Sequence, residues 1–172
     1  MSDTKLEILN PNDFDQVYDL MKKSFPPAEY RPYEKQLALL ENSNYKITVQ
    51  KENGNIIAFI AVWSLCGFDF VEHFAVTPDK RGGGIGSAFL KEYLSNNKNA
   101  VILEVEDKDD DISKRRIGFY TRLGFALSDV TYIQPTLSGN NDIIPLRLMH
   151  YNYKDSLNQA EKEIFKRIYK KI

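Results

Sequence analysis

The segment from Phe74 to Ser87 has the residue types of an anion-binding site. It reads Phe-Ala-Val-Thr-Pro-Asp-Lys-Arg-Gly-Gly-Gly-Ile-Gly-Ser, so an apolar strand is followed by two basic residues and then by four glycines in five positions. Glycine allows unusual backbone angles and lets a bulky anion approach the main chain. A helix that begins at about Ile85 presents unpaired amide donors and a partial positive charge at its start. The pattern therefore predicts a site for a phosphate or pyrophosphate group.

Two other phosphate-binding loops fit this segment less well. A nucleotide P-loop needs a lysine and then Ser or Thr after its last glycine, whereas serine follows Gly86 directly. The spacing of Gly82, Gly84 and Ser87 loosely imitates a dinucleotide-binding loop, and Glu104 stands near the position of its ribose-binding acid. However, a polar loop separates the strand from the glycines, and the preceding strands have the pattern of antiparallel hairpins. A dinucleotide-binding oxidoreductase is therefore the less favoured alternative.

A second block supports a specific family. The segment from Arg116 to Phe125 reads Arg-Ile-Gly-Phe-Tyr-Thr-Arg-Leu-Gly-Phe. It resembles the helix of the GNAT superfamily that ends in Phe-Tyr-x-x-Leu-Gly-Phe, and Arg81 to Gly86 resembles the Arg/Gln-x-x-Gly-x-Gly loop of these N-acetyltransferases, which are related to the yeast general-control histone acetyltransferase. The order of predicted elements is also similar, over about residues 5–150. The resemblance implies that acetyl-CoA donates an acetyl group to a primary amine by direct attack in a ternary complex.

The resemblance also implies roles for particular residues. Loop amides bind the coenzyme A pyrophosphate, and the strand before the loop splays from its neighbour so that its main chain pairs with the pantetheine arm. Tyr120 holds the position of the usual proton donor to the leaving thiolate, with packing on the sheet as the alternative. Many family members carry an asparagine where this chain has Ser113, which is predicted to cap the helix. The implied cofactor-binding residues are Phe74, Ala75, Val76, Arg81, Gly82, Gly83, Gly84, Ile85, Gly86, Ser87 and Ser113.

Strand alternation selects the candidate base. In a strand over 68–76, Glu72 is predicted to share a face with Phe74 and Val76, while His73 points to the other face. The acceptor amine must be neutral to attack, so Glu72 is predicted to deprotonate it, directly or through water. A structural or amine-binding carboxylate is the alternative.

The segment from Phe25 to Pro32 is predicted to border the acceptor pocket, because prolines fix it and it carries charged and aromatic groups. Glu29 and Tyr30 are predicted to hold a cationic amine, with Tyr132 facing them; an ordered surface loop is the alternative. The sequence leaves the acceptor open among amino acids, polyamines, antibiotics, peptide N-termini and protein lysines. The lack of an extended basic or low-complexity tail favours a small molecule over a protein.

Hydrophobic periodicity and turn signals predict the elements that position these residues. Their order implies an α/β fold of mixed type: a mixed, mostly antiparallel sheet of about seven strands with helices on both faces. We expect one domain over 1–172, with an additional C-terminal helix at 155–171 outside the resemblance. The predicted strands are 5–9, 45–50, 56–65, 68–76, 101–105, 125–133 and 144–151, and the helices begin near Asn10, Tyr33, Ile85, Ser113 and Ser156.

Composition limits the remaining function classes. The chain of 172 residues is 42% hydrophobic, which suffices for a core, and its formal charge of −1 gives no global attraction to nucleic acid or membrane. A single cysteine, Cys66, excludes an intrachain disulfide and favours the cytoplasm. Two histidines and one cysteine predict no metal site. A homodimer through the apolar seam of the last helix, and an acyl-CoA-binding regulatory module with little catalysis, stay open.

Overall fold

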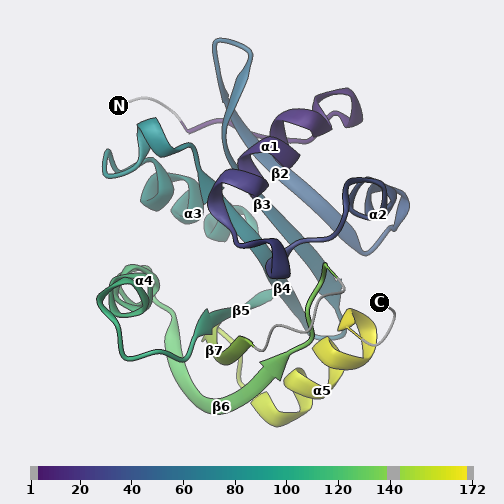
Figure 1. The fold of residues 1–172 in the computed structure, drawn as a ribbon. Helices are drawn as coiled ribbons and strands as arrows, with labels where there is room; N and C mark the ends of the chain where they lie inside the picture. The colour runs from purple at the N-terminus through teal and green to yellow at the C-terminus, as the bar shows by residue number, and fades with distance from the viewer. Residues whose placement is uncertain (1–3, 139–143, 170–172) are drawn as a thin grey trace.

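The computed structural model describes residues 4–138 and 144–169. Its centre is a seven-stranded sheet in the order β1-β2-β3-β4-β5-β7-β6 (Figure 1). β4 and β5 run parallel, and the other neighbours are antiparallel. The predicted mixed, mostly antiparallel α/β fold is therefore confirmed. The strands are β1 Leu6–Ile8, β2 Tyr45–Glu52, β3 Asn55–Leu65, β4 Phe68–Val76, β5 Ala100–Glu106, β6 Ala126–Gln134 and β7 Ile144–Tyr151.

Helices cover both faces of the sheet. Apolar residues of α1 and α5 pack into one core, and those of α3 and α4 pack into a second core on the opposite face. β3 lies between the two cores and is buried over most of its length, as its nearly continuous apolar sequence predicts. The helices are α1 Phe14–Ser24, α2 Tyr33–Ala38, α3 Ile85–Asn96, α4 Asp111–Arg122 and α5 Leu157–Arg167, with 3-10 turns η1 Pro11–Asp13, η2 Pro27–Glu29, η3 Leu39–Glu41 and η4 Pro78–Lys80.

The parallel pair β4–β5 separates part-way along its length. The two strands pair from Phe68 with Ala100 to Val71 with Leu103, and the ladder ends there (Figure 1). The following residues of β4, up to Val76, and the last residues of β5 therefore flank an opening in the sheet. A parallel pair needs a crossover, which α3 provides, and this places the glycine-rich segment at the same edge.

A β-bulge lies where β4 leaves β5. On the β3 side, Ala61 pairs with His73 and Val62 pairs with Val71, so Glu72 is the extra residue of β4. A bulge interrupts the alternation of side chains between the two faces. The expected alternation in β4 therefore fails at this residue.

The start of α4 also differs from its prediction. Asp110, not Ser113, is the N-cap, and its Oδ1 accepts a hydrogen bond from the amide of Ser113 at 2.7 Å. Ser113 thus lies inside the first turn, where its side chain is buried. Both residue types are good caps, and the carboxylate also interacts favourably with the helix dipole.

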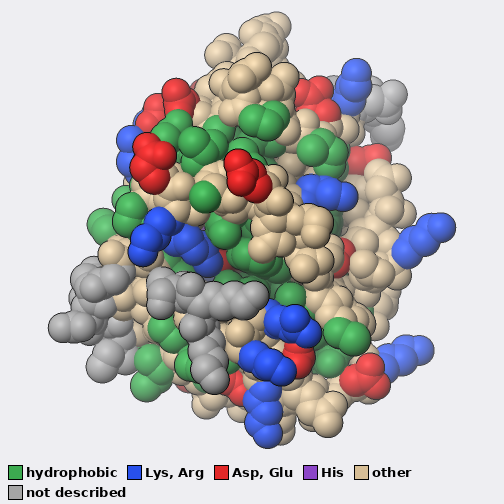
Figure 2. Space-filling model, turned by 90° about the vertical axis from the view of Figure 1, so that its right-hand side faces the viewer, with side chains coloured by type: hydrophobic (Ala, Val, Ile, Leu, Met, Phe, Trp, Pro, Cys, Tyr) green, Lys and Arg blue, Asp and Glu red, His purple; other side chains and the backbone are tan. Residues whose placement is uncertain are grey.

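On the face drawn in Figure 2, basic and acidic side chains of the described residues are interspersed. Within the described ranges, no helix is long and apolar enough to cross a membrane. The same residues contain no group of three or more His, Cys, Asp or Glu side chains arranged to hold a metal ion. The sequence places Cys66 at the end of an apolar run, which predicts a buried side chain, but Cys66 is exposed because it lies in the turn between β3 and β4.

Candidate active site

A cavity of about 880 Å³ occupies the opening between β4 and β5. Its walls come from β4, β5, the glycine-rich loop, α4 and the segment around η2. Cavities of this size hold small molecules and cofactors in many proteins. The glycine-rich loop, the helix that carries Tyr120 and the segment around Glu29 were predicted from separate stretches of sequence, and all three therefore border the same cavity.

The glycine-rich loop forms one end of the cavity. Gly82 and Gly84 have φ angles of 80° and 83°, a left-handed region that only glycine adopts readily. Gly84 is also the N-cap of α3 and has no side chain to occupy the first amides of that helix. A ligand phosphate can therefore approach these amides directly.

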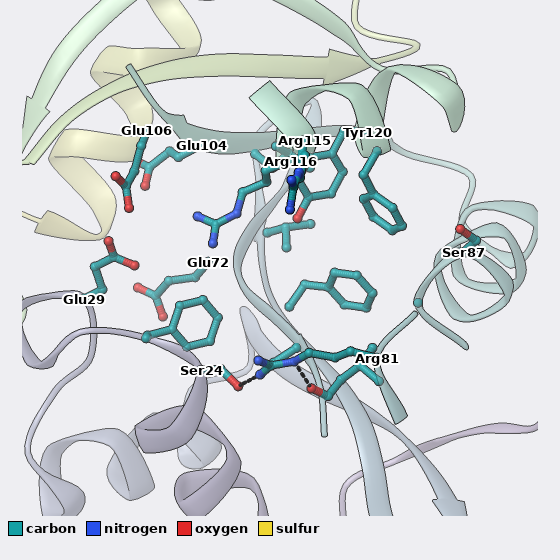
Figure 3. A pocket seen from close by; sticks show the side chains of 18 of the residues that line it. Ser24, Glu29, Glu72, Arg81, Ser87, Glu104, Glu106, Arg115, Arg116 and Tyr120 are labelled. Atoms are coloured by element: carbon teal, nitrogen blue, oxygen red, sulfur yellow. Dashed lines mark hydrogen bonds between the residues drawn. The ribbon is translucent and has the colours of Figure 1, made fainter. Parts of the chain in front are cut away.

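Arg81 holds this loop against the rest of the site. Its Nε donates to the carbonyl oxygen of Val76 at 2.9 Å, and its Nη2 donates to Oγ of Ser24 at 3.1 Å (Figure 3). The guanidinium thus ties the loop to the end of β4 and to the last residue of α1. Arg81 lines the cavity, so its positive charge remains available to a bound anion.

Gly86 lets α3 lie close to the cavity floor. A Cβ atom there would lie 3.4 Å from Cγ2 of Val76 and 3.6 Å from Cζ of Phe119. These are ordinary contact distances, so a side chain at position 86 would be tolerated better than one at Gly84, whose φ is positive. Phe119 in turn stacks on Phe74, with ring centroids 6.3 Å apart, and joins α4 to β4.

Tyr120 reaches the middle of the cavity from α4. Its ring packs edge-on against Phe119 and Phe125, and its hydroxyl points into the cavity (Figure 3). Burial raises the pKa of Tyr120 to about 12, partly offset by the charge of Arg116. Tyr120 is therefore protonated at neutral pH and can donate a hydrogen bond.

Glu72 is engaged in an ion pair with Arg31, which precedes α2. The two guanidinium donors lie 3.0 Å and 2.8 Å from the two carboxylate oxygens. Burial alone would raise the pKa of Glu72, but the charge and hydrogen bonds of Arg31 outweigh this effect and hold it below its usual value. A carboxylate held in this way is a weak proton acceptor, which argues against Glu72 as the base.

The predicted face of Glu72 is wrong because of the bulge, whereas His73 lies on the face opposite Phe74 and Val76, as predicted. Nδ1 of His73 lies 3.6 Å from Oε2 of Glu72, so the two side chains are neighbours. His73 also packs against Phe25 in the direction of α1, whereas Phe74 and Val76 pack with α3 and α4. Its Nε2 lies 2.6 Å from the carbonyl oxygen of Glu29. Burial lowers the pKa of His73, so the neutral ring donates from Nε2 and helps to fix the η2 segment.

Glu104 is a functional candidate to which the sequence analysis gave no role in acetyl transfer. It follows Leu103 directly, at the point where the β4–β5 ladder ends, and it lines the cavity. The hydroxyl of Tyr169 lies 2.7 Å and 2.9 Å from its two oxygens, and the hydroxyl of Tyr132 donates to Oε1. Burial raises the pKa of Glu104 to about 8. The sequence signal was an acidic residue inside the apolar run from Val101 to Val105.

The cavity is electrostatically divided. Glu29, Glu72, Glu104 and Glu106 gather on one side, while Arg81 lies with the glycine-rich loop on the other (Figure 3). Arg115 and Arg116 of α4 also line the cavity, and sequence reasoning gave neither a role. Burial, followed by the charge of Glu106, raises the pKa of Glu29. The acidic side can attract a cation, and the loop side can attract an anion.

The structure brings together most of the predicted site residues. Tyr30 instead packs its ring edge-on against Tyr18, and Tyr132 contributes through its bond to Glu104 rather than by lining the cavity. Gly83, Ile85 and Ser113 also lie outside the lining. The predicted residues that line the cavity are Glu29, Glu72, Phe74, Ala75, Val76, Arg81, Gly82, Gly84, Gly86, Ser87 and Tyr120.

Comparison with known proteins agrees with this geometry. A family model described as "Acetyltransferase (GNAT) domain" matches residues 43–127, which include both the glycine-rich loop and Tyr120. A solved structure from Bacteroides thetaiotaomicron, assigned provisionally as a GNAT-family acetyltransferase, is 30% identical, covers 96% of this chain and 98% of its own, and superposes with a TM-score of 0.86. The chain belongs to the GNAT acetyltransferase family. The predicted superfamily is confirmed.

Two further relatives of this GNAT acetyltransferase extend the comparison. YjbC of Bacillus subtilis (strain 168), provisionally named an acetyltransferase, is 26% identical over 158 residues, which are 90% of this chain and 80% of YjbC. The ribosomal-protein-S18-alanine N-acetyltransferase from Escherichia coli is 21% identical, with a TM-score of 0.64 over 88% of this chain and 95% of its own. The second likeness shows the shared fold alone.

Proposed function

We propose that this GNAT acetyltransferase moves an acetyl group from acetyl-CoA to a primary amine within a ternary complex. The observation that carries the proposal is the divided cavity between β4 and β5. One end has free helix amides and Arg81, which suit a pyrophosphate, and the other has carboxylates, which suit an ammonium group. Tyr120 stands between these two ends.

The cofactor would lie along β4 and end at the glycine-rich loop. Amides from Gly82 to Ser87 would bind the pyrophosphate, because the loop conformation turns the start of α3 toward the cavity. The main chain of Phe74 to Val76 would pair with the pantetheine arm, because the β4–β5 ladder has already ended at Val71. Ser113 is buried outside the cavity lining, so we assign it to the helix and not to the cofactor.

Tyr120 would act on the departing sulfur. A thiol has an ordinary pKa of about 8.5, so its thiolate is a moderate leaving group that a hydrogen bond from a protonated tyrosine stabilises. A positioned acid of this kind contributes roughly 10²–10⁴-fold in rate. Because its pKa is raised to about 12, Tyr120 remains a donor across the physiological pH range.

The acceptor would enter at the acidic side, where Glu29 and Glu106 are available to a cationic amine. Glu72, paired with Arg31, would shape this region rather than accept a proton. Structural neighbours include a spermidine N-acetyltransferase chimera from Vibrio cholerae and the ribosomal-protein-S18-alanine N-acetyltransferase from Escherichia coli. For this chain we favour a small cationic amine.

The proposed catalytic unit is one domain over 1–172. We include the C-terminal helix because Tyr169, which follows α5, reaches Glu104 in the cavity wall. The exposed, unpaired thiol of Cys66 suits the cytoplasm. The homodimer stays a prediction.

Calorimetric titration with acetyl-CoA, with NADH titrated in parallel, tests the cofactor. We expect saturable acetyl-CoA binding by the wild-type protein and its loss in Gly84→Glu, which places a charge and bulk in the loop. Binding of NADH without acetyl-CoA would overturn the proposal. A panel of small amines, peptides and lysine-containing proteins, followed by release of free thiol, then tests transfer. Acetyl-CoA binding without transfer to any of them would favour the regulatory module.

A further inference from the structure

We propose that Glu104 accepts the proton that the acceptor ammonium must lose, and that Tyr169 positions Glu104 for this step. The inference rests on the proposed transfer to an amine. It gives the segment after α5 a role in the active site, although this segment lies outside the region in which the family motifs occur.

The position of Glu104 fits this role. It is the first residue of β5 beyond the ladder with β4, so its side chain faces the opening where acetyl-CoA and acceptor would meet. Tyr120 lines the same cavity from the opposite wall (Figure 3). A base on one side and an acid on the other leave room for the reacting carbon between them.

The partners of Glu104 orient it without neutralising it. Tyr169 hydrogen-bonds to both carboxylate oxygens at 2.7 Å and 2.9 Å, and Tyr132 of β6 donates to one of them. Among the described Lys, Arg and His side chains, none lies within ion-pair distance of Glu104, whereas Glu72 is paired with Arg31. Two neutral donors fix the carboxylate and leave it able to take a proton.

The surroundings of Glu104 also favour proton uptake near neutral pH. Burial raises its pKa to about 8, the charges of Glu72 on β4 and Glu29 on η2 act in the same direction, and the hydrogen bond from Tyr169 opposes them. Glu106 is the other carboxylate of β5 that lines the cavity. A general base works best when its pKa lies near the working pH.

The proton balance of the reaction is complete with these groups. Glu104 takes one proton from the ammonium, which leaves a neutral amine with a free electron pair. This pair forms the new C–N bond to the acetyl carbon, and the C–S bond then breaks with its electrons on sulfur. Tyr120 gives its hydroxyl proton to sulfur, and the second proton lost by the nitrogen restores that hydroxyl. The products are the amide, the free thiol of coenzyme A and one proton that Glu104 returns to solvent.

The first test needs no knowledge of the acceptor. In protein labelled with carboxyl-¹³C glutamate, the resonance that disappears in Glu104→Gln should titrate near pH 8. In Tyr169→Phe we expect this titration at higher pH, because the hydrogen bond that stabilises the carboxylate is lost. Tyr153→Phe, which removes a hydroxyl from a ring packed on Phe68 of the same core, should leave the titration unchanged. Titration below pH 6 in the wild type, or no difference between the two tyrosine variants, would overturn the proposal.

The second test uses the amine from the screening panel with the highest kcat/KM. Glu104→Gln should lower kcat by about 10²-fold or more and remove the acidic limb of the pH profile, while acetyl-CoA affinity is retained. Tyr169→Phe should shift this limb to higher pH. Glu161→Gln removes an equal charge from α5, outside the cavity lining, and should keep both kcat and the limb. A change in KM alone for Glu104→Gln would overturn the proposal but leave acetyl transfer intact, whereas a wild-type protein that does not bind acetyl-CoA would refute the proposed function itself.

Discussion

Arg31 and Glu72 form a doubly hydrogen-bonded ion pair whose side chains are only 6% and 1% exposed. The pair joins the segment before α2 to the bulge of β4, 41 positions along the chain. It therefore fixes one wall of the cavity, and it explains how a carboxylate remains charged at a buried position. Stability and the shape of the acceptor region depend on the same contact.

Replacement of Arg31 by methionine should destabilise the protein by about 3–5 kcal/mol at pH 7, because it leaves an unpaired charge in the interior. The pKa of Glu72 is held below its ordinary value of 4.5 in the folded state, so the pair stabilises the fold above that pH and loses its effect as the pH falls. In Arg31→Met the buried carboxylate has lost this partner, so burial raises the pKa of Glu72 and the variant relieves its unpaired charge by taking up a proton as the pH falls. The difference between wild type and Arg31→Met should thus shrink between pH 7 and pH 4. Urea unfolding at both pH values measures it.

A second substitution separates the buried charge from lost packing. Adding Glu72→Gln to Arg31→Met removes the unpaired charge and should recover part of the stability at pH 7. Equal stability of the wild type and Arg31→Met at pH 7 would contradict the account of the pair.

Local sequence signals predicted much of the fold. The bounds of β4 and β7 agree with the predicted strands 68–76 and 144–151, because turn residues and apolar runs mark their ends. Asn53 and Gly54 adopt positive φ angles, as expected for the hairpin between β2 and β3. The glycine-rich loop and Tyr120 could be found because their motifs are contiguous in sequence.

Long-range contacts could not be predicted in the same way. The bulge at Glu72 depends on register with β3, which a strand pattern alone does not specify. The hydrogen bond between Glu104 and Tyr169 joins residues 65 positions apart in the sequence. The ion pair of Arg31 with Glu72 joins the segment before α2 to β4, 41 positions further along the chain. The choice between two acidic residues as the base therefore needed the folded structure.

Gly84→Ala and Gly83→Ala form a matched pair within the loop. A Cβ at Gly84 meets no atom within 4 Å, but its φ of +83° disfavours any residue with a side chain. We expect Gly84→Ala to cost about 1–2 kcal/mol and to weaken acetyl-CoA binding several-fold. Gly83 lacks this positive φ, and its added Cβ would lie 3.6 Å from the carbonyl oxygen of Lys80, so Gly83→Ala should change both quantities little. Thermal unfolding and calorimetry measure the two effects, and equal behaviour of both variants would contradict the backbone explanation.

Tyr120→Phe should lower kcat by about 10²-fold or more without loss of acetyl-CoA affinity. The ring packs against Phe119 and Phe125 through its apolar edge, so removal of the hydroxyl preserves these contacts. Tyr93→Phe is the control, because Tyr93 lies on α3 and lines a separate cavity. Thiol release under saturating substrates gives kcat. An unchanged kcat in Tyr120→Phe would show that this hydroxyl is not the acid.

Glu104→Gln should stabilise the protein at alkaline pH even where it lowers activity. The pKa of Glu104 is raised from 4.5 to about 8 in the folded state, so the folded protein must lose a buried proton above pH 8, while the unfolded chain loses it near 4.5. Wild-type stability therefore falls as the pH rises between these values, and the difference corresponds to about 4–5 kcal/mol. Glutamine has nearly the same shape and never ionises, so the stability of Glu104→Gln should match that of the wild type near pH 4 and exceed it at pH 8.5.

Chemical unfolding at both pH values measures this difference in stability, with Glu106→Gln as the control for loss of a carboxylate on β5. A gain at pH 4 as large as that at pH 8.5 would mean that the ionisation of Glu104 is not its cause.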